Sequence, residues 1–267
     1  MPSESEDREP SRGIFDLTGT VALVTGGNNG IGLAGATALS RSGASVAIWG
    51  RRSDRNDEAA EALRQVGHGV AYSATVDVSD PAAVVTGFKE VVAELGRVDC
   101  VFVNAGIADH ASSFLAITDD SRDAVLGTNL LGAWSTIRAA VAHMVERAGR
   151  GDHGGSIIVN GSLAASRGLV GGEHYGAAKA ALGAVVRGIA VEYGHIGVRA
   201  NMICPGYIER DGAPGRFATE LAKRGPIPRY GRPDEISGIL VYLASDASSY
   251  HTGDVITVDG GWSVDVR

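Results

Sequence analysis

Seven short apolar runs alternate with amphipathic stretches along the chain, and this alternation constrains the fold more than any other feature. The runs are rich in β-branched residues and predict strands at 20–24, 45–49, 69–74, 100–103, 156–160, 199–203 and 255–258. Helical patterns lie between them, for example at 31–41, 57–66, 82–95 and 119–147. Buried strands alternating with helices are typical of a parallel sheet covered on both faces. We therefore predict an α/β chain with a single-domain doubly wound (Rossmann) fold, a seven-stranded parallel sheet with helices on both faces.

Composition narrows the class of partner. The 267 residues carry a net charge of −7, so binding of nucleic acid by bulk electrostatic attraction is not expected. No apolar run approaches the roughly 18 residues that a membrane helix needs, so no membrane partner is expected. Residues 1–13 are polar and acidic and predict a disordered tail ahead of one domain at 14–267. Cys100 and Cys204 lie in strand-like runs, which predicts buried free thiols and a cytoplasmic protein.

The first predicted strand runs directly into a glycine-rich turn. Gly26, Gly30 and Gly32 follow the spacing Gly-x-x-x-Gly-x-Gly, and a helical pattern begins at once. Glycines let the backbone approach a phosphate without Cβ clashes, and the N–H groups at a helix N-terminus attract an anion. An ordinary strand-to-helix turn that favours glycine could have the same sequence pattern. The position after the first strand of a β-α-β unit favours a pyrophosphate site instead.

Tyr175 and Lys179 stand four residues apart in an alanine-rich helical stretch and therefore share one helix face. A nearby ammonium stabilises a phenolate, and a tyrosine tuned in this way can exchange a proton with a carbonyl or alcohol oxygen. Ser162, thirteen residues earlier at the end of a predicted strand, could bind the same oxygen. Taken singly, a Tyr–Lys pair at this spacing is common, and Ser162 could be a strand-end cap.

Together these motifs resemble the short-chain dehydrogenase/reductase family over roughly residues 15–263. The family fingerprint Thr-Gly-x-x-x-Gly-Ile-Gly matches from Thr25 to Gly32. The resemblance is to the branch that holds 3-oxoacyl-acyl-carrier-protein reductases and sugar or polyol dehydrogenases. It implies an oxidoreductase that transfers a hydride between a nicotinamide cofactor and a carbonyl or secondary alcohol. The substrate would be a 3-oxoacyl thioester, a sugar or polyol, or another small ketone. Residues 252–261 match a region that packs across subunits in relatives, which implies a homo-oligomer, either dimer or tetramer.

The resemblance also assigns roles to single residues. Asn129, Ser162, Tyr175 and Lys179 would form the catalytic set, with Tyr175 as general acid/base and Asn129 supporting a water that links Lys179 to solvent. The residues expected to bind the cofactor are Gly26, Asn28, Asn29, Gly30, Ile31, Arg51, Arg52, Asp77, Val78, Asn104, Ala105, Gly106, Tyr175, Lys179, Pro205, Gly206 and Ile208. Asp77 would receive the adenine amino group, although a cap or turn aspartate fits its spacing almost as well.

The end of the second predicted strand bears on the choice of cofactor. An NAD site usually places a carboxylate there, but Gly50 occupies this position and Arg51 and Arg52 follow. Arginine binds a phosphate through paired hydrogen bonds, so we expect NADP(H), with NAD(H) as the other possibility. Two features oppose this choice. Both arginines could be solvated surface residues, and Asp54 could then move in to accept hydrogen bonds from the ribose hydroxyls. In addition, NADP-binding relatives often carry a basic residue where this chain has Asn29.

Substrate selection is expected from a lid at about 207–232, which joins a strand end to a later helix and carries Gly and Pro hinges. Its basic residues are Arg210, Arg216, Lys223, Arg224 and Arg229. They could attract an anionic substrate, although a solvated lid surface is the simpler explanation. Arg210 also replaces a threonine that relatives place four residues after Gly206. His110 and His174 border the expected pocket; either could contact the substrate, but we expect both to be surface histidines. No residues stand at metal-ligand spacing, so no metal is expected.

Two other function classes fit the same fold. A catalytically weak cofactor-sensing regulatory protein would typically lack the tyrosine or the lysine, and this sequence has both. The other class is a lyase, epimerase or dehydratase that uses the same cofactor. Sugar-nucleotide epimerases of the extended type have the spacing Gly-x-x-Gly-x-x-Gly and a larger C-terminal domain, and this sequence has neither.

Overall fold

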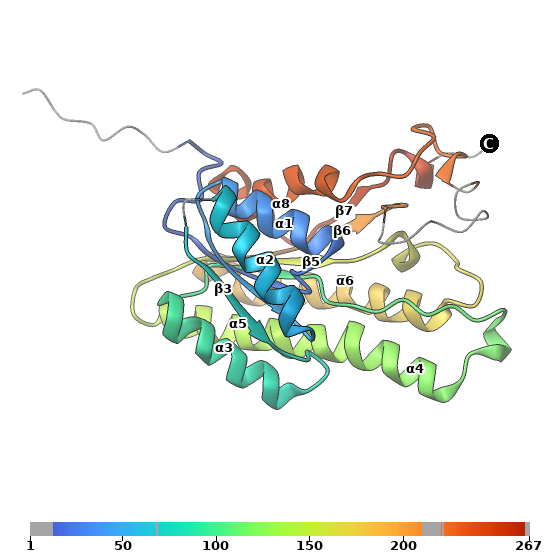
Figure 1. Cartoon of the computed structure of the whole chain (residues 1–267), viewed down its shortest axis with the longest axis horizontal. Coiled ribbons are helices and arrows are strands. Elements are labelled where there is room, and N and C mark those ends of the chain that lie inside the picture. Colours follow the sequence, from blue (N-terminus) through green and yellow to red (C-terminus); the bar gives the residue numbers. More distant parts are fainter. Residues whose placement is uncertain (1–12, 68, 210–219, 221, 265–267) are drawn as a thin grey trace, which may run out of the picture.

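The computed structural model describes residues 13–67, 69–209, 220 and 222–264. Figure 1 shows the whole chain and labels its helices and strands. The predicted tail at 1–13 falls almost wholly outside the described residues. Arg210 and Arg216 of the predicted lid also lie outside them.

Seven parallel strands form one sheet, which confirms the predicted fold class. Their spatial order is β3-β2-β1-β4-β5-β6-β7, and every neighbouring pair runs in the same direction. The strands are β1 Val21–Thr25, β2 Ser45–Gly50, β3 Ala71–Thr75, β4 Cys100–Val103, β5 Gly155–Asn160, β6 Val198–Pro205 and β7 Val255–Val258. Because β1 pairs with both β2 and β4, the strand order reverses there, at the place where such sheets bind ligands.

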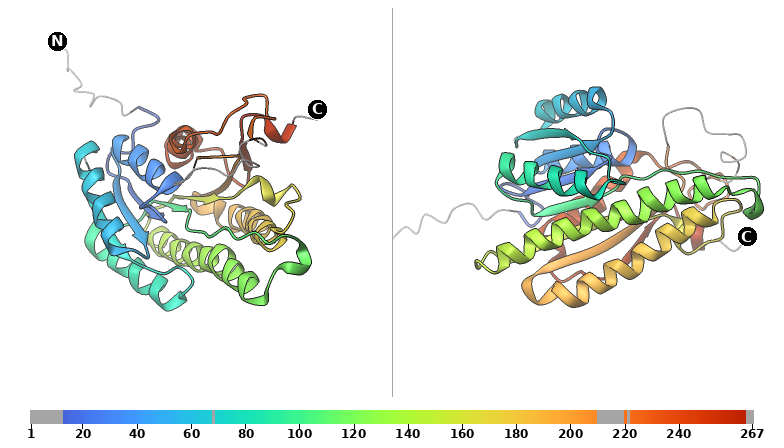
Figure 2. Two further views of the ribbon diagram at one scale, coloured as in Figure 1. Left: turned by 45° about the vertical axis from the view of Figure 1, so that its right-hand side comes forward. Right: turned by 90° about the horizontal axis from the view of Figure 1, so that it is seen from below.

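Helices cover both faces of the sheet (Figures 1 and 2). The α-helices of the described part are α1 Gly30–Arg41, α2 Ser53–Val66, α3 Pro81–Leu95, α4 Asp119–Leu126, α5 Ala133–Ala148, α6 Glu173–Tyr193 and α8 Ser237–Ala244. Side chains of α1, α2 and α8 share one buried cluster with the sheet, and those of α3, α5 and α6 share the other. Strand residues alternate between the clusters: Phe102 faces the first and Val101 faces the second, as the period of two requires.

Local sequence signals explain where individual helices begin and end, and α3 is the clearest case. The Asp80 side chain accepts a hydrogen bond from the backbone N–H of Ala82, and Pro81 supplies the first residue of the helix. The helix ends at Gly96, whose φ of 81° lies in the left-handed region that glycine adopts without strain. These signals fix both ends of α3, which connects the end of β3 to the start of β4.

The stretch predicted as one helix at 119–147 is interrupted. A π-helical segment, Gly127–Gly132, separates α4 from α5 and contains Asn129. A π-helical turn holds about one residue more than an α-helical turn, and over six residues the apolar spacing does not distinguish the two. The predicted strand boundaries were closer, since β4 and β7 match and the others differ by one or two residues.

Candidate active site

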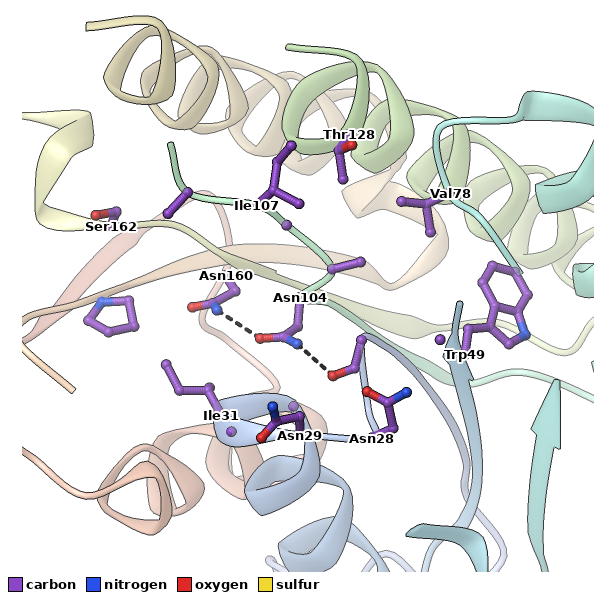
Figure 3. A pocket seen from close by; sticks show the side chains of 18 of the residues that line it. Asn28, Asn29, Ile31, Trp49, Val78, Asn104, Ile107, Thr128, Asn160 and Ser162 are labelled. Atoms are coloured by element: carbon purple, nitrogen blue, oxygen red, sulfur yellow. Dashed lines mark hydrogen bonds between the residues drawn. The ribbon is translucent and has the colours of Figure 1, made fainter. Parts of the chain in front are cut away.

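A cavity of about 540 Å³ lies at the carboxyl ends of the strands. It is lined by every residue that the sequence predicted to bind the cofactor, and Figure 3 shows many of these side chains. Ser162, Tyr175 and Lys179 of the predicted catalytic set also line it, whereas Asn129 does not. The fold therefore brings together residues that are far apart in the sequence.

The glycine turn between β1 and α1 forms one wall of the cavity. Gly26 and Gly30 have φ values of 64° and 52°, a region that other residues rarely adopt. A Cβ on Gly32 would collide with the carbonyl oxygen of Gly26 and lie 2.5 Å from Asn104 Nδ2. Asn29 stands at the N-cap of α1, but its side chain does not cap the helix. The first N–H groups of α1 can thus bind an anion, which fits a pyrophosphate.

A hydrogen-bond network joins this turn to the end of β4. The buried Thr25 hydroxyl oxygen accepts the backbone N–H groups of Asn104 at 2.9 Å and Ala105 at 3.0 Å. Asn104 Nδ2 donates to the carbonyl oxygens of Thr25 and Gly26. Asn160 Nδ2 donates to Asn104 Oδ1 at 2.8 Å (Figure 3). Asn104 therefore fixes the shape of the cavity floor in addition to lining it.

Lys179 and Tyr175 project from the first turns of α6. Lys179 is 4% exposed, and its Nζ donates to the carbonyl oxygen of Asn160 at 2.6 Å. The same Nζ lies 5.9 Å from the centroid of the Tyr175 ring. Gly106 makes room for this arrangement, because a Cβ there would lie 3.7 Å from Lys179 Nζ and 3.1 Å from Asn129 Oδ1. The ammonium is thus held beside the phenol by the end of β5.

Asn129 fixes the segment that follows β4. Its Oδ1 accepts from the backbone N–H of Ile107 at 2.8 Å, and its Nδ2 donates to the Ile107 carbonyl oxygen at 2.7 Å. The side chain is 1% exposed. Asn129 lies in the π-helical segment, and its amide makes both of these bonds to the Ile107 backbone. The expected role of Asn129 in holding a water stays a prediction.

Ser162 has the capping role that its sequence position allowed, and its binding of a substrate oxygen stays a prediction. Its hydroxyl oxygen accepts from the backbone N–H of Ala164 at 3.2 Å and so caps the short 3-10 helix Leu163–Ala165. It also lies on the cavity wall (Figure 3). A hydroxyl that accepts this bond still carries its own hydrogen, which it can donate to a substrate oxygen.

One of the two pocket histidines is not where the sequence predicted it. His174 is only 6% exposed, so its assignment to the surface is wrong. Its Nε2 lies 3.3 Å from the Ser121 hydroxyl, which donates to Asp109 at 2.6 Å. Because that hydroxyl hydrogen is engaged, the histidine Nε2 carries the hydrogen between them. His110 is exposed, and its ring meets the Tyr175 ring edge to face at 6.2 Å.

Asp77 lines the cavity and also forms the turn that its spacing allowed, while its contact with adenine stays a prediction. Its Oδ1 accepts the backbone N–H of Ser79 at 3.0 Å and the Ser79 hydroxyl at 2.7 Å, so it does form a turn. These hydrogen bonds lower the pKa of the Asp77 carboxyl, and the positive charge of Arg51 lowers it further. Arg51 and Arg52 are exposed on the cavity rim, and Asp54 is not among the lining residues.

Sequence comparisons show which known proteins this chain resembles. The sequence model of a family described as enoyl-(acyl carrier protein) reductase matches residues 26–263. The chain is 34% identical to the 3-oxoacyl-acyl-carrier-protein reductase of Chlamydia trachomatis, over 92% of this chain and 98% of that protein. It is 35% identical to gluconate 5-dehydrogenase of Gluconobacter oxydans, over 94% and 97%. It belongs to the short-chain dehydrogenase/reductase family.

A solved member of the family shows how far the likeness extends in space. The structure of a gluconate 5-dehydrogenase from Burkholderia cenocepacia, in complex with NADP and tartrate, superposes with a TM-score of 0.87 at 31% identity. The superposition covers 95% of this chain and 98% of that one. This chain is therefore an oxidoreductase of the short-chain family, whose dehydrogenases use a nicotinamide cofactor and act on CH–OH groups.

Some residues of this short-chain enzyme's site escaped the sequence analysis. Asn160 holds Lys179 through its carbonyl group, and its buried Oδ1 has no hydrogen-bond partner among the described residues. Its place two residues before Ser162, at the end of a predicted strand, was the available signal. Thr128 and Ile107 also line the cavity without having been predicted.

Backbone hydrogen bonds join the two described ends of the predicted lid. Glu209 N donates to the Gly231 carbonyl oxygen at 2.9 Å, and Gly231 N donates to that of Tyr207 at 2.8 Å. Two of the lid cations have acidic partners: Lys223 pairs with Glu220 at 3.0 Å, and Arg229 pairs with Glu235 at 2.6 Å. These pairs reduce the positive charge that the described part of the lid offers to a substrate.

Cys100 and Cys204 are buried and free, as predicted. Within the described ranges, no three His, Cys, Asp or Glu residues are grouped so that they could hold a metal ion. None of the helices described is both long and apolar enough to span a bilayer.

Proposed function

We propose that this enzyme interconverts a ketone and a secondary alcohol with NADP(H), using Tyr175 as general acid/base. The observation that carries the proposal is the convergence at one cavity of Tyr175, the buried Lys179 and Ser162. The helix start that can bind an anion and the small residues at the end of β4 lie on the same cavity. A regulatory protein that only senses the cofactor would have no need of this arrangement.

The residues that would hold the cofactor follow the cavity from end to end. The glycine turn and the start of α1 suit the pyrophosphate, Val78 and Asp77 suit the adenine, and Asn160 and Lys179 suit the hydroxyls of the second ribose. When bound, the nicotinamide would donate or accept the hydride. All other steps fall to side chains of this chain.

Proton transfer would proceed between Tyr175 and the substrate oxygen. Ser162 would donate a hydrogen bond to that oxygen and stabilise the charge that develops on it. Tyr175 would deliver its phenolic proton during reduction and take it back during oxidation. Lys179 would stabilise the phenolate through its positive charge, and the Asn160 carbonyl keeps the ammonium in place.

NADP(H) is favoured over NAD(H) by the residues after β2. Gly50 leaves this strand end without a carboxylate, and Arg51 and Arg52 on the cavity rim suit a 2′-phosphate. A relative of known structure binds NADP. Arg52 also lies at the start of α2, where the first N–H groups favour negative charge.

The proposed substrate is a small ketone or alcohol, either a 3-oxoacyl thioester or a sugar-derived hydroxy compound. Both classes are named among the relatives. We further propose a cytoplasmic homo-oligomer, as the resemblance of residues 252–261 implied.

A substrate panel tests the proposal. Purified enzyme is incubated with acyl, sugar, steroid and quinone carbonyls and the matching alcohols, with NADPH/NADP⁺ or NADH/NAD⁺, and the reduced nicotinamide absorbance is followed. We expect turnover of at least one carbonyl class, faster with NADPH. Cofactor binding without turnover of any class would favour the sensing protein instead.

A further inference from the structure

Gly50, the last residue of β2, is a glycine for reasons of space alone. It lies in a regular strand, and its φ is not positive, unlike those of Gly26 and Gly30. The backbone at this position would accept any residue. An aspartate there is the usual device of an NAD site, because it accepts hydrogen bonds from both ribose hydroxyls and repels a 2′-phosphate. What keeps this position a glycine therefore bears on which cofactor binds.

Two asparagines occupy the space beside Gly50. A Cβ built there would collide with Asn28 Nδ2 and Asn56 Oδ1, and would lie 3.0 Å from Asn28 Cγ. Asn28 belongs to the glycine turn and Asn56 to the first turns of α2. Their side chains are joined by a hydrogen bond of 2.6 Å from Asn28 Nδ2 to Asn56 Oδ1. In Figure 3 the Asn28 amide nitrogen points toward the strand that carries Trp49.

Asn56 has no freedom to move aside. It is 1% exposed, and its Nδ2 donates at 3.0 Å both to the carbonyl oxygen of Gly50 and to that of Ala74 at the end of β3. Carbonyl oxygens only accept, so these two bonds fix which way the amide is turned. Its Oδ1 must then face Asn28. Gly27 N, which donates to the Trp49 carbonyl oxygen at 3.2 Å, holds the glycine turn against the same strand end.

We propose that Asn56, acting through Asn28, determines cofactor specificity by closing the space in which an NAD-selecting carboxylate would stand. The ribose 2′ position is left to the guanidinium groups of Arg51 and Arg52, so the ligand recognised is an adenosine 2′-phosphate. This inference rests on the proposed NADP(H) dependence. It goes further by stating that a substitution at Gly50 cannot reverse the preference while the asparagine bridge is intact.

Equilibrium binding of NADPH and NADH to the purified full chain tests this without a substrate, by fluorescence titration. Four proteins are compared: wild type, Gly50→Asp, Gly50→Asp with Asn28→Ala and Asn56→Ala, and Gly50→Asp with Asp57→Ala. Asp57 is the matched control, because it also joins α2 to β3, through the Ser73 hydroxyl at 3.1 Å. None of its atoms is among the three nearest to a Cβ built on Gly50.

We expect wild type to prefer NADPH and Gly50→Asp to bind both cofactors more weakly without preferring NADH. Removing both asparagines should raise the NADH affinity of Gly50→Asp by at least about tenfold, or 1.4 kcal/mol. The Asp57→Ala control should not raise it. A stable Gly50→Asp protein that prefers NADH would overturn this inference while leaving the proposed function intact. Wild type that prefers NADH would overturn both.

Thermal unfolding of Gly50→Ala keeps the test decisive if Gly50→Asp does not fold. This variant adds only the Cβ and leaves the charge unchanged. We expect it to lower the melting temperature in the wild-type background and to lower it less once Asn28→Ala and Asn56→Ala are present. Equal shifts in the two backgrounds would show that the asparagines do not close this space.

Discussion

Thr25 offers a quantitative test of how the cavity floor is built. Its side chain is fully buried, and one hydroxyl oxygen accepts two backbone N–H groups, those of Asn104 and Ala105. Thr25→Val replaces the hydroxyl with a methyl group of similar size, so the packing is conserved while both N–H groups lose their acceptor. A buried donor left unsatisfied costs about 1–3 kcal/mol, so the pair predicts about 2–6 kcal/mol of lost stability.

Thermal unfolding followed by circular dichroism measures this loss. For a chain of this size each kcal/mol lowers the melting temperature by about 2–4 °C, so we expect a decrease of at least about 4 °C. NADPH affinity should fall as well, because the two N–H groups hold the small residues that line the cavity. Thr25→Ser is the control: it keeps the acceptor and loses one buried methyl group, worth about 0.8 kcal/mol. Equal melting temperatures for the two variants would refute the hydrogen-bond argument.

Three other predictions follow from single contacts. Asn129→Ala frees Ile107 and should lower turnover by at least about tenfold in steady-state assays, because the segment beside Tyr175 loses its anchor; unchanged turnover would refute the anchoring role. Hydrogen bonds from Arg147 lower the pKa of Asp152 from 3.8 to about 2. The stabilisation is therefore complete above about pH 4 and is lost as the pH falls toward 2. Urea unfolding should show a smaller deficit for Asp152→Asn at pH 2.5 than at pH 7, and an equal deficit at both would contradict this. Arg51→Ala should weaken NADPH binding by about tenfold and NADH binding far less, and titration that shows equal losses would exclude a role at the 2′-phosphate.

Much of the fold and site could be predicted from local sequence. The run at Cys100–Val103 gave a strand with the observed boundaries, because buried parallel strands need continuous apolar residues. The run at Val255–Val258 also gave the observed boundaries, although this edge strand is only partly buried. The glycine spacing placed the anion-binding turn, since the φ values at Gly26 and Gly30 demand residues of this type. Tyr175 and Lys179 met as their helical spacing required.

The features that escaped prediction depend on contacts between distant segments. The π-helical segment around Asn129 serves the backbone of Ile107, which is 22 residues away. Asn56 looks like an ordinary polar residue of an amphipathic helix, and it is buried only because β2 and β3 end beside it. His174 is buried because α4 supplies Ser121. No local pattern encodes these encounters.

Turnover by Tyr175→Phe tests the central claim most directly. The change removes one hydroxyl from the ring that lies beside Lys179 and leaves the shape of the cavity intact. With a substrate identified by the panel, we expect turnover to fall by about 10²- to 10⁴-fold, the usual contribution of a general acid/base. The melting temperature should change little, which separates loss of chemistry from loss of folding. Turnover close to that of the wild type would show that another group moves the proton.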